Sequence, residues 1–527
     1  MSLSAHRKGS LPQLALLILA HMNASLFPWL RERSSGVLLH ITSLPSDLGI
    51  GNLGKQAYRF IDFLEATGMR YWQLCPLGPT GFGDSPYQSF SSFAGNPYFI
   101  DLHPLIADGL LSAADLQPLH EISNKKVDYA SLYARFFPIM HVACERFAEQ
   151  QRNLSEYGNF DKFVQAHRSW LLPYAAFSAL KHHYNGQPWY TWPEENRSFK
   201  KFRQSALFGQ LEPKFMSTYF EQYLFFGQLA QLRRYAHEKG IQFIGDIPIF
   251  VSPDSADIWA NPHLFQLDKH NKKTAVAGVP PDYFSSTGQL WGNPLYDWQA
   301  NADEDYQWWI QRLAHQFKIF DVVRLDHFRG FHEYWSIPAG AKDATSGKWI
   351  PGPQMNFFKA VQQAMPDAQL IAEDLGEATP GLFEFREETG LPGMAILQFA
   401  FGGGADNSYL PHNLERNCVM YPGTHDNNTT IGWYAEAPQN VAHHMRTYFQ
   451  TDGKAPNWEF IRATYASVAR MGIIPLQDLM GLDASARLNI PGTPQDNWQW
   501  RFSSWQLDQL WNQQAGYLKS LKETYNR

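Results

Sequence analysis

The sequence predicts an α/β fold, a (β/α)8 barrel with large insertions after its second and third strands. Three observations lead to this prediction. Eight short apolar segments rich in β-branched and aromatic residues recur along the 527 residues. Helical patterns can be placed after most of them, and acidic residues fall at or just after their carboxyl ends. A chain of this length can hold one large barrel with insertions.

The eight expected strands begin with a βαβ unit. In chain order they are residues 36–41, 71–77, 241–248, 322–326, 370–374, 395–399, 418–421 and 473–478. The first strand ends at the turn Ser43-Leu44-Pro45, and a helix is expected over residues 55–67. A strand, a helix and a second strand in this order indicate a parallel sheet. The last helix is expected over residues 505–524.

The expected domain is one barrel over residues 34–527, interrupted twice. Residues 79–239 read as a mostly helical insertion, and residues 251–305 as a loop-rich one with many Pro, Gly and aromatic residues. The residues after 478 suffice for a loop and one helix, so no C-terminal β-sandwich domain is expected. Residues 1–33 read as an N-terminal extension. Their apolar run at 14–20 is similar to the start of a secretory signal, but a later start at Met22 is the alternative.

Composition excludes several classes of function. A total of 44 Lys+Arg against 50 Asp+Glu gives a net charge of −6, so no nucleic-acid partner is expected. The apolar run near the N-terminus is too short to cross a bilayer, so no membrane partner is expected either. Three cysteines form no disulfide framework and favour the cytoplasm. His-x-His, Cys-x-x-Cys and Walker motifs are absent from the sequence, so neither a metal nor an organic cofactor is expected.

Aromatic residues make up 15% of the sequence, including 18 Trp. Flat rings pack against the C–H faces of sugars, so this composition suits a carbohydrate cleft. Aromatic rings also fill hydrophobic cores, so composition alone does not decide.

Arg324 and Asp326 lie two residues apart at the end of an expected strand. Side chains alternate on a strand, so both point the same way. A neighbouring cation favours the ionised carboxylate, which is the form that a nucleophile needs. The alternative is a buried ion pair that serves only the fold.

Three more acids occupy equivalent positions. Asp246 ends the third expected strand, Glu373 ends the fifth, and Asp426 follows the seventh. One such acid is often a helix cap, but four on one rim favour chemistry, because barrel enzymes hold their catalytic residues there. Asp246 has two interpretations: it orients Arg324, or it satisfies backbone donors.

Two carboxyls at one centre have separated pKa values, which a retaining glycosidase needs for its nucleophile and its acid/base. We assign Asp326 as the nucleophile and Glu373 as the acid/base. Asp426 then binds sugar hydroxyls and favours ring distortion. His425 and His327 are expected as neutral hydrogen-bond partners.

Four segments around these residues resemble the signature regions of the α-amylase clan: Gly245-Asp246-Ile247-Pro248, Arg324-Leu325-Asp326-His327, Ala372-Glu373-Asp374-Leu375-Gly376 and Thr424-His425-Asp426-Asn427. Further motifs narrow the resemblance to the 4-α-glucanotransferases, also called amylomaltases or disproportionating enzymes. These motifs are Ser43-Leu44-Pro45, Gly83-Asp84-Ser85-Pro86-Tyr87-Gln88, Gly278-Val279-Pro280-Pro281-Asp282-Tyr283-Phe284, Trp291-Gly292-Asn293-Pro294-Leu295-Tyr296 and Pro491-Gly492-Thr493.

The resemblance implies an enzyme that moves α-1,4-glucan segments between malto-oligosaccharides, starch or glycogen chains. It implies a covalent glycosyl-enzyme, no cofactor, and Asp326, Glu373 and Asp426 as the catalytic residues. It also implies substrate contacts from Arg324, His425, His327, Ser85, Tyr87, Asp246, and from a covering loop with Asp282, Phe284, Trp291 and Asn293. The alternative for that loop is a Pro-rich surface segment that packs its own aromatics.

Two positions depart from the family pattern. Ser286 stands where many members carry Glu, and Phe82 replaces a tyrosine that helps some relatives to form a secondary glucan site. A hydrolase of the same clan and a glucan-binding protein without activity remain alternatives at this point. We expect a monomer or a weak oligomer.

Overall fold

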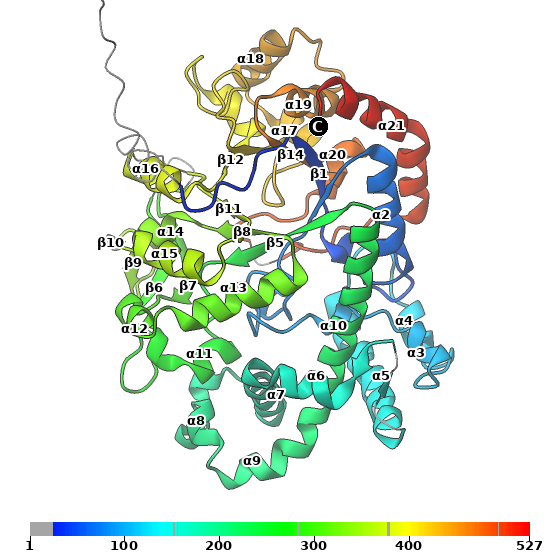
Figure 1. The fold of residues 1–527 in the computed structure, drawn as a ribbon, viewed down its shortest axis with the longest axis vertical. Coiled ribbons are helices and arrows are strands. Elements are labelled where there is room, and N and C mark those ends of the chain that lie inside the picture. Colours follow the sequence, from blue (N-terminus) through cyan, green and yellow to red (C-terminus); the bar gives the residue numbers. More distant parts are fainter. Residues whose placement is uncertain (1–24, 151–152, 155, 282–284, 377–379, 494) are drawn as a thin grey trace, which may run out of the picture.

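The computed structural model describes residues 25–150, 153–154, 156–281, 285–376, 380–493 and 495–527. Its centre is an eight-stranded parallel sheet in the order β11-β8-β5-β2-β1-β14-β13-β12 (Figure 1). In chain order these strands are β1 (Ser34–Leu38), β2 (Tyr71–Gln73), β5 (Gln242–Pro248), β8 (Val322–Asp326), β11 (Leu370–Ala372), β12 (Gly393–Ile396), β13 (Cys418–Tyr421) and β14 (Met471–Pro475). The predicted barrel is confirmed.

The two outer strands of this sheet, β11 and β12, nearly close the barrel. The N–H of Ala372 donates to the carbonyl of Pro392 at 2.9 Å. The N–H of Met394 donates to Asp374 Oδ1 at 2.8 Å, so a carboxylate stands where a strand would offer a carbonyl. Gly393 permits this approach, because a Cβ there would collide with the side chains of Arg386 and Asp374. We call this junction the β11–β12 seam.

Several strands are shorter or shifted relative to the predictions. Strand β2 ends at Gln73, not at residue 77, and β11 ends at Ala372, which leaves Glu373 in the following loop. Cys75 and Leu77 are nevertheless buried. A run of apolar residues indicates burial but not strand pairing, and these residues stay buried beyond the last paired residue of β2. Strand β12 continues into a 3-10 helix, Leu397–Gly402, where residues 397–399 were predicted as strand.

Helices cover the outside of the barrel. These are α2 (Lys55–Thr67), α13 (Gln307–Ile319), α15 (Gln354–Ala364), α16 (Pro380–Thr389), α17 (Thr430–Glu436), α18 (Gln439–Phe449), α19 (Pro456–Ala466), α20 (Leu476–Leu479) and α21 (Ser504–Thr524). Phe60, Ile61, Phe63 and Leu64 form the buried face of α2, which packs beside α21 (Figure 1). The first and last helices thus close the outer ring.

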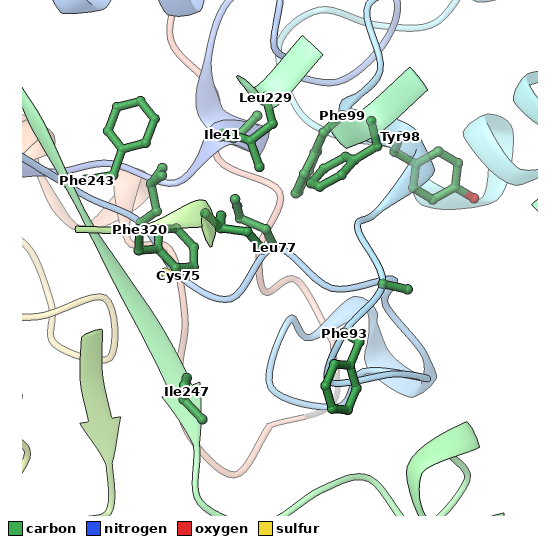
Figure 2. Close-up of a cluster of buried hydrophobic side chains, with 14 of the residues drawn as sticks. Ile41, Cys75, Leu77, Phe93, Tyr98, Phe99, Leu229, Phe243, Ile247 and Phe320 are labelled. Atoms are coloured by element: carbon green, nitrogen blue, oxygen red, sulfur yellow. The ribbon is translucent and has the colours of Figure 1, made fainter. Parts of the chain in front are cut away.

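The segment between β2 and β5 is mostly helical. It contains α3 (Pro104–Ala107), α4 (Gln117–His120), α5 (Tyr129–Glu149), α6 (Phe160–Ala166), α7 (Arg168–His183), α8 (Phe199–Phe202), α9 (Ala206–Leu211) and α10 (Phe215–Glu238), with a short β3 (Asn153–Leu154) and β4 (Gly158–Asn159). Helices α5 to α9 gather in the lower part of Figure 1, and α10 runs from them back to the barrel. One hydrophobic core joins both regions. It includes Phe93 and Phe99 of this segment as well as Phe243 and Phe320 of the barrel (Figure 2).

The segment between β5 and β8 is more regular than the predicted loop-rich insertion. Besides α11 (Ala256–Ala260) and α12 (Trp298–Asp303) it holds the hairpin strands β6 (Ala275–Val279) and β7 (Gln289–Pro294). The short helix α14 (Arg329–His332) is followed by strands β9 (Glu333–Pro338) and β10 (Lys348–Pro351). These two strands extend the hairpin into a four-stranded sheet, β10-β9-β6-β7. Strand β9, which pairs with β6, follows the barrel strand β8 in the chain. The local sequence around β6 therefore does not predict this sheet.

Within the described part of the chain, no helix has the length and apolarity that a membrane crossing requires.

Candidate active site

Arg324 lies between two carboxylates. Its Nη1 donates to both oxygens of Asp246, at 2.8 and 2.7 Å, and to Asp326 Oδ1 at 3.0 Å. Arg324 projects from the middle of β8 and is buried, whereas the Asp326 side chain at the strand end stays 29% exposed. The alternation of β8 therefore places Arg324 and Asp326 together as predicted. Of the two interpretations of Asp246, the structure shows the contact with Arg324.

Tyr87 joins this ion pair to the loop after β13. Its hydroxyl donates to Asp246 Oδ2 at 2.7 Å, and its ring stacks on His425 with centroids 5.1 Å apart. Trp498 packs against both rings, at 5.8 Å from each. The three aromatic side chains fix one wall of the site. Ser85 accepts a hydrogen bond at its Oγ from the N–H of Tyr87, at 3.3 Å.

Glu373 follows β11 and lies beside the end of β8, because the two strands pair from Leu370 opposite Val323 to Ala372 opposite Leu325. Glu373 Oε2 accepts the backbone N–H of His327 at 2.6 Å. His327 adopts the left-handed backbone conformation, with φ 50°, which turns its N–H toward this carboxyl. The neighbouring strand ends thus bring Asp326 and Glu373 to the same part of the rim.

Burial governs the titration of these two acids. It raises the pKa of Glu373 to about 8, against the opposing field of Arg324. It also raises the pKa of Asp326, to about 6, although Arg324 favours its ionised form. Arg324 must serve Asp246 as well as Asp326, so it does not hold Asp326 at its ordinary pKa. The predicted order remains: Asp326 ionises before Glu373.

Asp426 is held from the loop after β14. Asn489 Nδ2 donates to Asp426 Oδ1 at 2.6 Å, and Arg487 Nη2 donates to the Asp426 carbonyl at 2.6 Å. His425 Nε2 lies 3.5 Å from the same carboxyl oxygen. Asn489 and Arg487 are not among the site residues predicted from the sequence. Their signal was an arginine and an asparagine two residues apart, directly before Pro491-Gly492-Thr493.

Asp478, at the end of the eighth unit, has a supporting position. It accepts the N–H of Thr430 at 2.7 Å and its hydroxyl at 2.8 Å, where α17 begins. The carboxylate thus satisfies free donors at the helix N-terminus. Because α17 directly follows the loop with Asp426, this contact fixes the far end of that loop.

The predicted covering loop is the turn of the β6–β7 hairpin. Asp282 and Phe284 lie outside the described residues, as does the side chain of Phe82; Ser286 is exposed. Trp291 meets the ring of His327 edge to face, with centroids 4.9 Å apart. Asn293 is buried and donates to the Val251 carbonyl at 2.9 Å, so this contact anchors the hairpin.

His327 is a neutral histidine at this place. Burial and the charge of Arg329 lower its pKa to about 4. Its Nε2 is buried and has no hydrogen-bond partner among the described residues. A neutral ring nitrogen without a partner is suited to a hydrogen bond with a ligand hydroxyl.

The family model described as 4-alpha-glucanotransferase matches residues 39–507. The chain belongs to the 4-alpha-glucanotransferase family. It is therefore an enzyme with transferase activity on α-glucans. It is 46% identical over 482 residues to a 4-alpha-glucanotransferase of Streptococcus pneumoniae, covering 91% of this chain and 95% of the relative. It is 40% identical to a chloroplastic 4-alpha-glucanotransferase of Arabidopsis thaliana, covering 94% of this chain and 86% of the relative.

Solved structures agree with this assignment. An amylomaltase from Streptococcus agalactiae, determined in complex with acarbose, superimposes with a TM-score of 0.89 at 37% identity. The match covers 94% of this chain and all of that one. An amylomaltase from Corynebacterium glutamicum matches with a TM-score of 0.73 at 18% identity, over 93% of this chain and 75% of that one, and supports the fold alone.

Proposed function

We propose that this 4-alpha-glucanotransferase works by a retaining double displacement with Asp326 as the nucleophile. In the first step the Asp326 carboxylate attacks C1 of the donor glucose, and the C1–O4 bond breaks. Glu373 gives its proton to the departing O4, so the shortened chain leaves with a free 4-hydroxyl. The transferred segment is then an ester of Asp326.

In the second step a new chain replaces the departed one. Its 4-hydroxyl gives its proton to the Glu373 carboxylate and attacks C1, and the C1–Asp326 bond breaks. Glu373 is protonated again and Asp326 is ionised again, so the cycle closes without a cofactor. Both steps invert C1, and the α-1,4 linkage is retained.

The remaining residues bind and orient the sugar in this proposal. Asp426 and His425 bind hydroxyls of the reacting glucose and favour its distortion. Arg324, Tyr87 and Asp246 fix the wall behind Asp326. His327 Nε2 accepts a sugar hydroxyl, and Trp291 offers a ring face. Ser85 and Asn293, whose described contacts are with the protein, act by holding Tyr87 and the hairpin. Asp282 and Phe284 complete the covering loop.

The observation that carries the proposal is the pairing of Asp326 and Glu373. Asp326 ends β8 and Glu373 directly follows the adjacent strand β11. Asp326 contacts a guanidinium, and Glu373 has the higher pKa. A nucleophile and an acid need this difference.

The test is Asp326→Asn, a nearly isosteric change. We expect transfer from maltotriose to fall on the order of a thousandfold or more, because the covalent route is lost. Circular dichroism and the melting temperature are the controls for folding. Near-normal transfer by the folded variant would contradict the assignment.

The substrates proposed are malto-oligosaccharides and the outer chains of starch or glycogen. Incubation with maltotriose should give glucose and longer oligomers. Acarbose, which the Streptococcus agalactiae relative holds, should occupy the same rim, and a crystal of that complex should show the two carboxyls about 5–5.5 Å apart. We also propose a cytoplasmic enzyme, since Cys75 and Cys418 are buried free thiols. We further propose a monomer or weak oligomer, which sedimentation velocity tests.

A further inference from the structure

Asp47, His103 and His120 form a cluster on the surface that none of the catalytic contacts involves. One ligand atom from each residue lies within 4.8 Å of the other two, and this is the only such group among the described residues. His103 Nε2 is 3.2 Å and His120 Nε2 is 3.5 Å from Asp47 Oδ2. We propose that this cluster binds one divalent transition-metal ion, with Zn²⁺ as the reference ion.

The spacing of the three atoms suits tetrahedral coordination. With Zn–N and Zn–O bonds of about 2.0–2.1 Å, two ligands of a tetrahedral site lie about 3.3 Å apart. The two distances to Asp47 Oδ2 already bracket this value. One ligand nitrogen of each imidazole lies within 4.8 Å of the other. Two His and one carboxylate leave a fourth position for water, because all three side chains are exposed.

A second carboxylate orients one of the ligands. His103 Nδ1 lies 2.8 Å from Asp101 Oδ1, so this nitrogen carries a proton and donates it. The Nε2 lone pair of a neutral His103 would then face the Asp47 carboxylate, and two acceptors cannot face each other without a cation between them. In metal sites, a histidine that binds the ion through one nitrogen usually donates its other ring N–H to a carboxylate or a carbonyl, as His103 does to Asp101.

The segments that carry the ligands are fixed in place. The backbone of Asp101 exchanges two hydrogen bonds of 2.8 Å with the side chain of Gln228 on α10. The loop with Asp47 is held by Arg501, whose Nη2 donates to the Ser46 carbonyl at 2.9 Å. Because the ligands come from the β1–α2 loop and from two points of the next segment, a bound ion would link these segments without large rearrangement.

His103 has a carboxylate on each side of its ring. Asp101 Oδ1 lies 2.8 Å from Nδ1, and Asp47 Oδ2 lies 3.2 Å from Nε2. A metal ion bound at Nε2 takes the place of a proton there, so metal binding releases protons and becomes tighter as pH rises.

The experiment is a calorimetric titration of the metal-stripped full chain with Zn²⁺. It is carried out at pH 6.5, 7.0 and 7.5, at each pH in two buffers of different ionisation enthalpy. We expect one saturable equivalent, release of about one proton, and tighter binding at each higher pH. Co²⁺ in place of Zn²⁺ should give the visible absorption of a tetrahedral site. Saturation with Zn²⁺ should raise the melting temperature.

The variants locate the ion. Asp47→Asn and His120→Gln should each weaken Zn²⁺ binding at least tenfold, and Asp101→Asn by about 10- to 100-fold. His141→Gln is the matched control, because His141 is exposed and lies 3.3 Å from Glu145 on one helix without a third ligand. Binding that is absent in the parent, or unchanged in Asp47→Asn and His120→Gln, overturns the proposal.

Discussion

Glu373 and Asp326 are both partly buried acids, but of the two only Asp326 has a described hydrogen bond with a guanidinium. The proposed first step requires Asp326 ionised and Glu373 protonated. Because burial raises the pKa of Asp326 to about 6 and that of Glu373 to about 8, the active combination is most populated between these values. We expect kcat/KM for maltotriose to fall below about pH 6 and again above about pH 8. A profile that stays flat from pH 5 to pH 9 would contradict this assignment.

The same pKa of Glu373 has a consequence for stability. In the unfolded chain an ordinary glutamate loses its proton near pH 4.3, whereas the native enzyme keeps it to about pH 8. Between these values the native state binds more protons, so this group makes stability fall as pH rises. Glu373→Gln carries no such proton. The unfolding free energy of Glu373→Gln relative to the parent should therefore increase from pH 5 to pH 8, which urea denaturation at each pH measures.

Asn489 is expected to position Asp426. The substitution Asn489→Ala removes the side-chain amide that donates to Asp426 Oδ1 at 2.6 Å. We expect kcat to fall about 10- to 100-fold while KM changes little, because a small displacement of a group that acts in the transition state mainly affects turnover. Asn417→Ala is the control, since Asn417 also donates one side-chain bond, to the Gly390 carbonyl before β12. Equal effects of the two variants would remove Asn489 from the site.

At the scale of the element, we expect the β6–β7 hairpin to decide which acceptor resolves the proposed intermediate. In the proposed mechanism water and a sugar both use Glu373 as the base, so the carboxylates do not choose between them. Trp291 projects from this hairpin onto His327 and is only partly buried. It can exclude water and stack on a glucose ring at the same time.

Trp291→Ala should therefore raise the ratio of hydrolysis to transfer. New reducing ends measured against glucose released from maltotriose give this ratio. Trp349→Ala serves as the control, because Trp349 lies in the same sheet but contacts Trp335 and Arg329. A ratio that is unchanged in Trp291→Ala would exclude the hairpin from acceptor choice.

At the scale of the whole molecule, Arg527 joins the last helix to the amino ends of the barrel. Its guanidinium is 6% exposed and donates to carbonyls of Ser34, Thr464, Tyr465, Ser467, Ala469 and Arg470. Few side chains make so many bonds to the main chain. They connect β1, the end of α19 and the residue before β14.

Arg527→Ala should destabilise the enzyme by about 2–4 kcal/mol, because several buried carbonyls lose a charged donor. Urea denaturation measures this loss. The rate of glucan transfer at 25 °C should stay within twofold, since the contacts lie at the amino ends of the strands. A loss of stability below about 0.5 kcal/mol would show that water replaces the guanidinium.

Features that depend on contacts within one segment of the chain could be predicted from the sequence, whereas features that depend on contacts between distant segments could not. Local rules sufficed for the barrel strands and for Arg324 beside Asp326, because burial and the two-residue period act within one segment. They left Asp246 undecided, since its partner lies on the next strand of the sheet. They missed the β6–β7 sheet, the role of Asn489 and the cluster of Asp47, His103 and His120. In each of these, residues far apart in the chain meet only after folding.

The β11–β12 seam is the least bonded line of the barrel, with one described backbone hydrogen bond beside the contact of Asp374 with Met394. Glu373 is the residue next to it. Local opening costs least where few main-chain bonds must break, so amide hydrogens on both sides of this line should exchange with solvent before those of β5 or β8. Each such opening would move Glu373, the proposed proton donor, away from the glycosidic oxygen while the rest of the barrel stays folded. On heating, the enzyme is therefore expected to become inactive at a lower temperature than the one at which it unfolds.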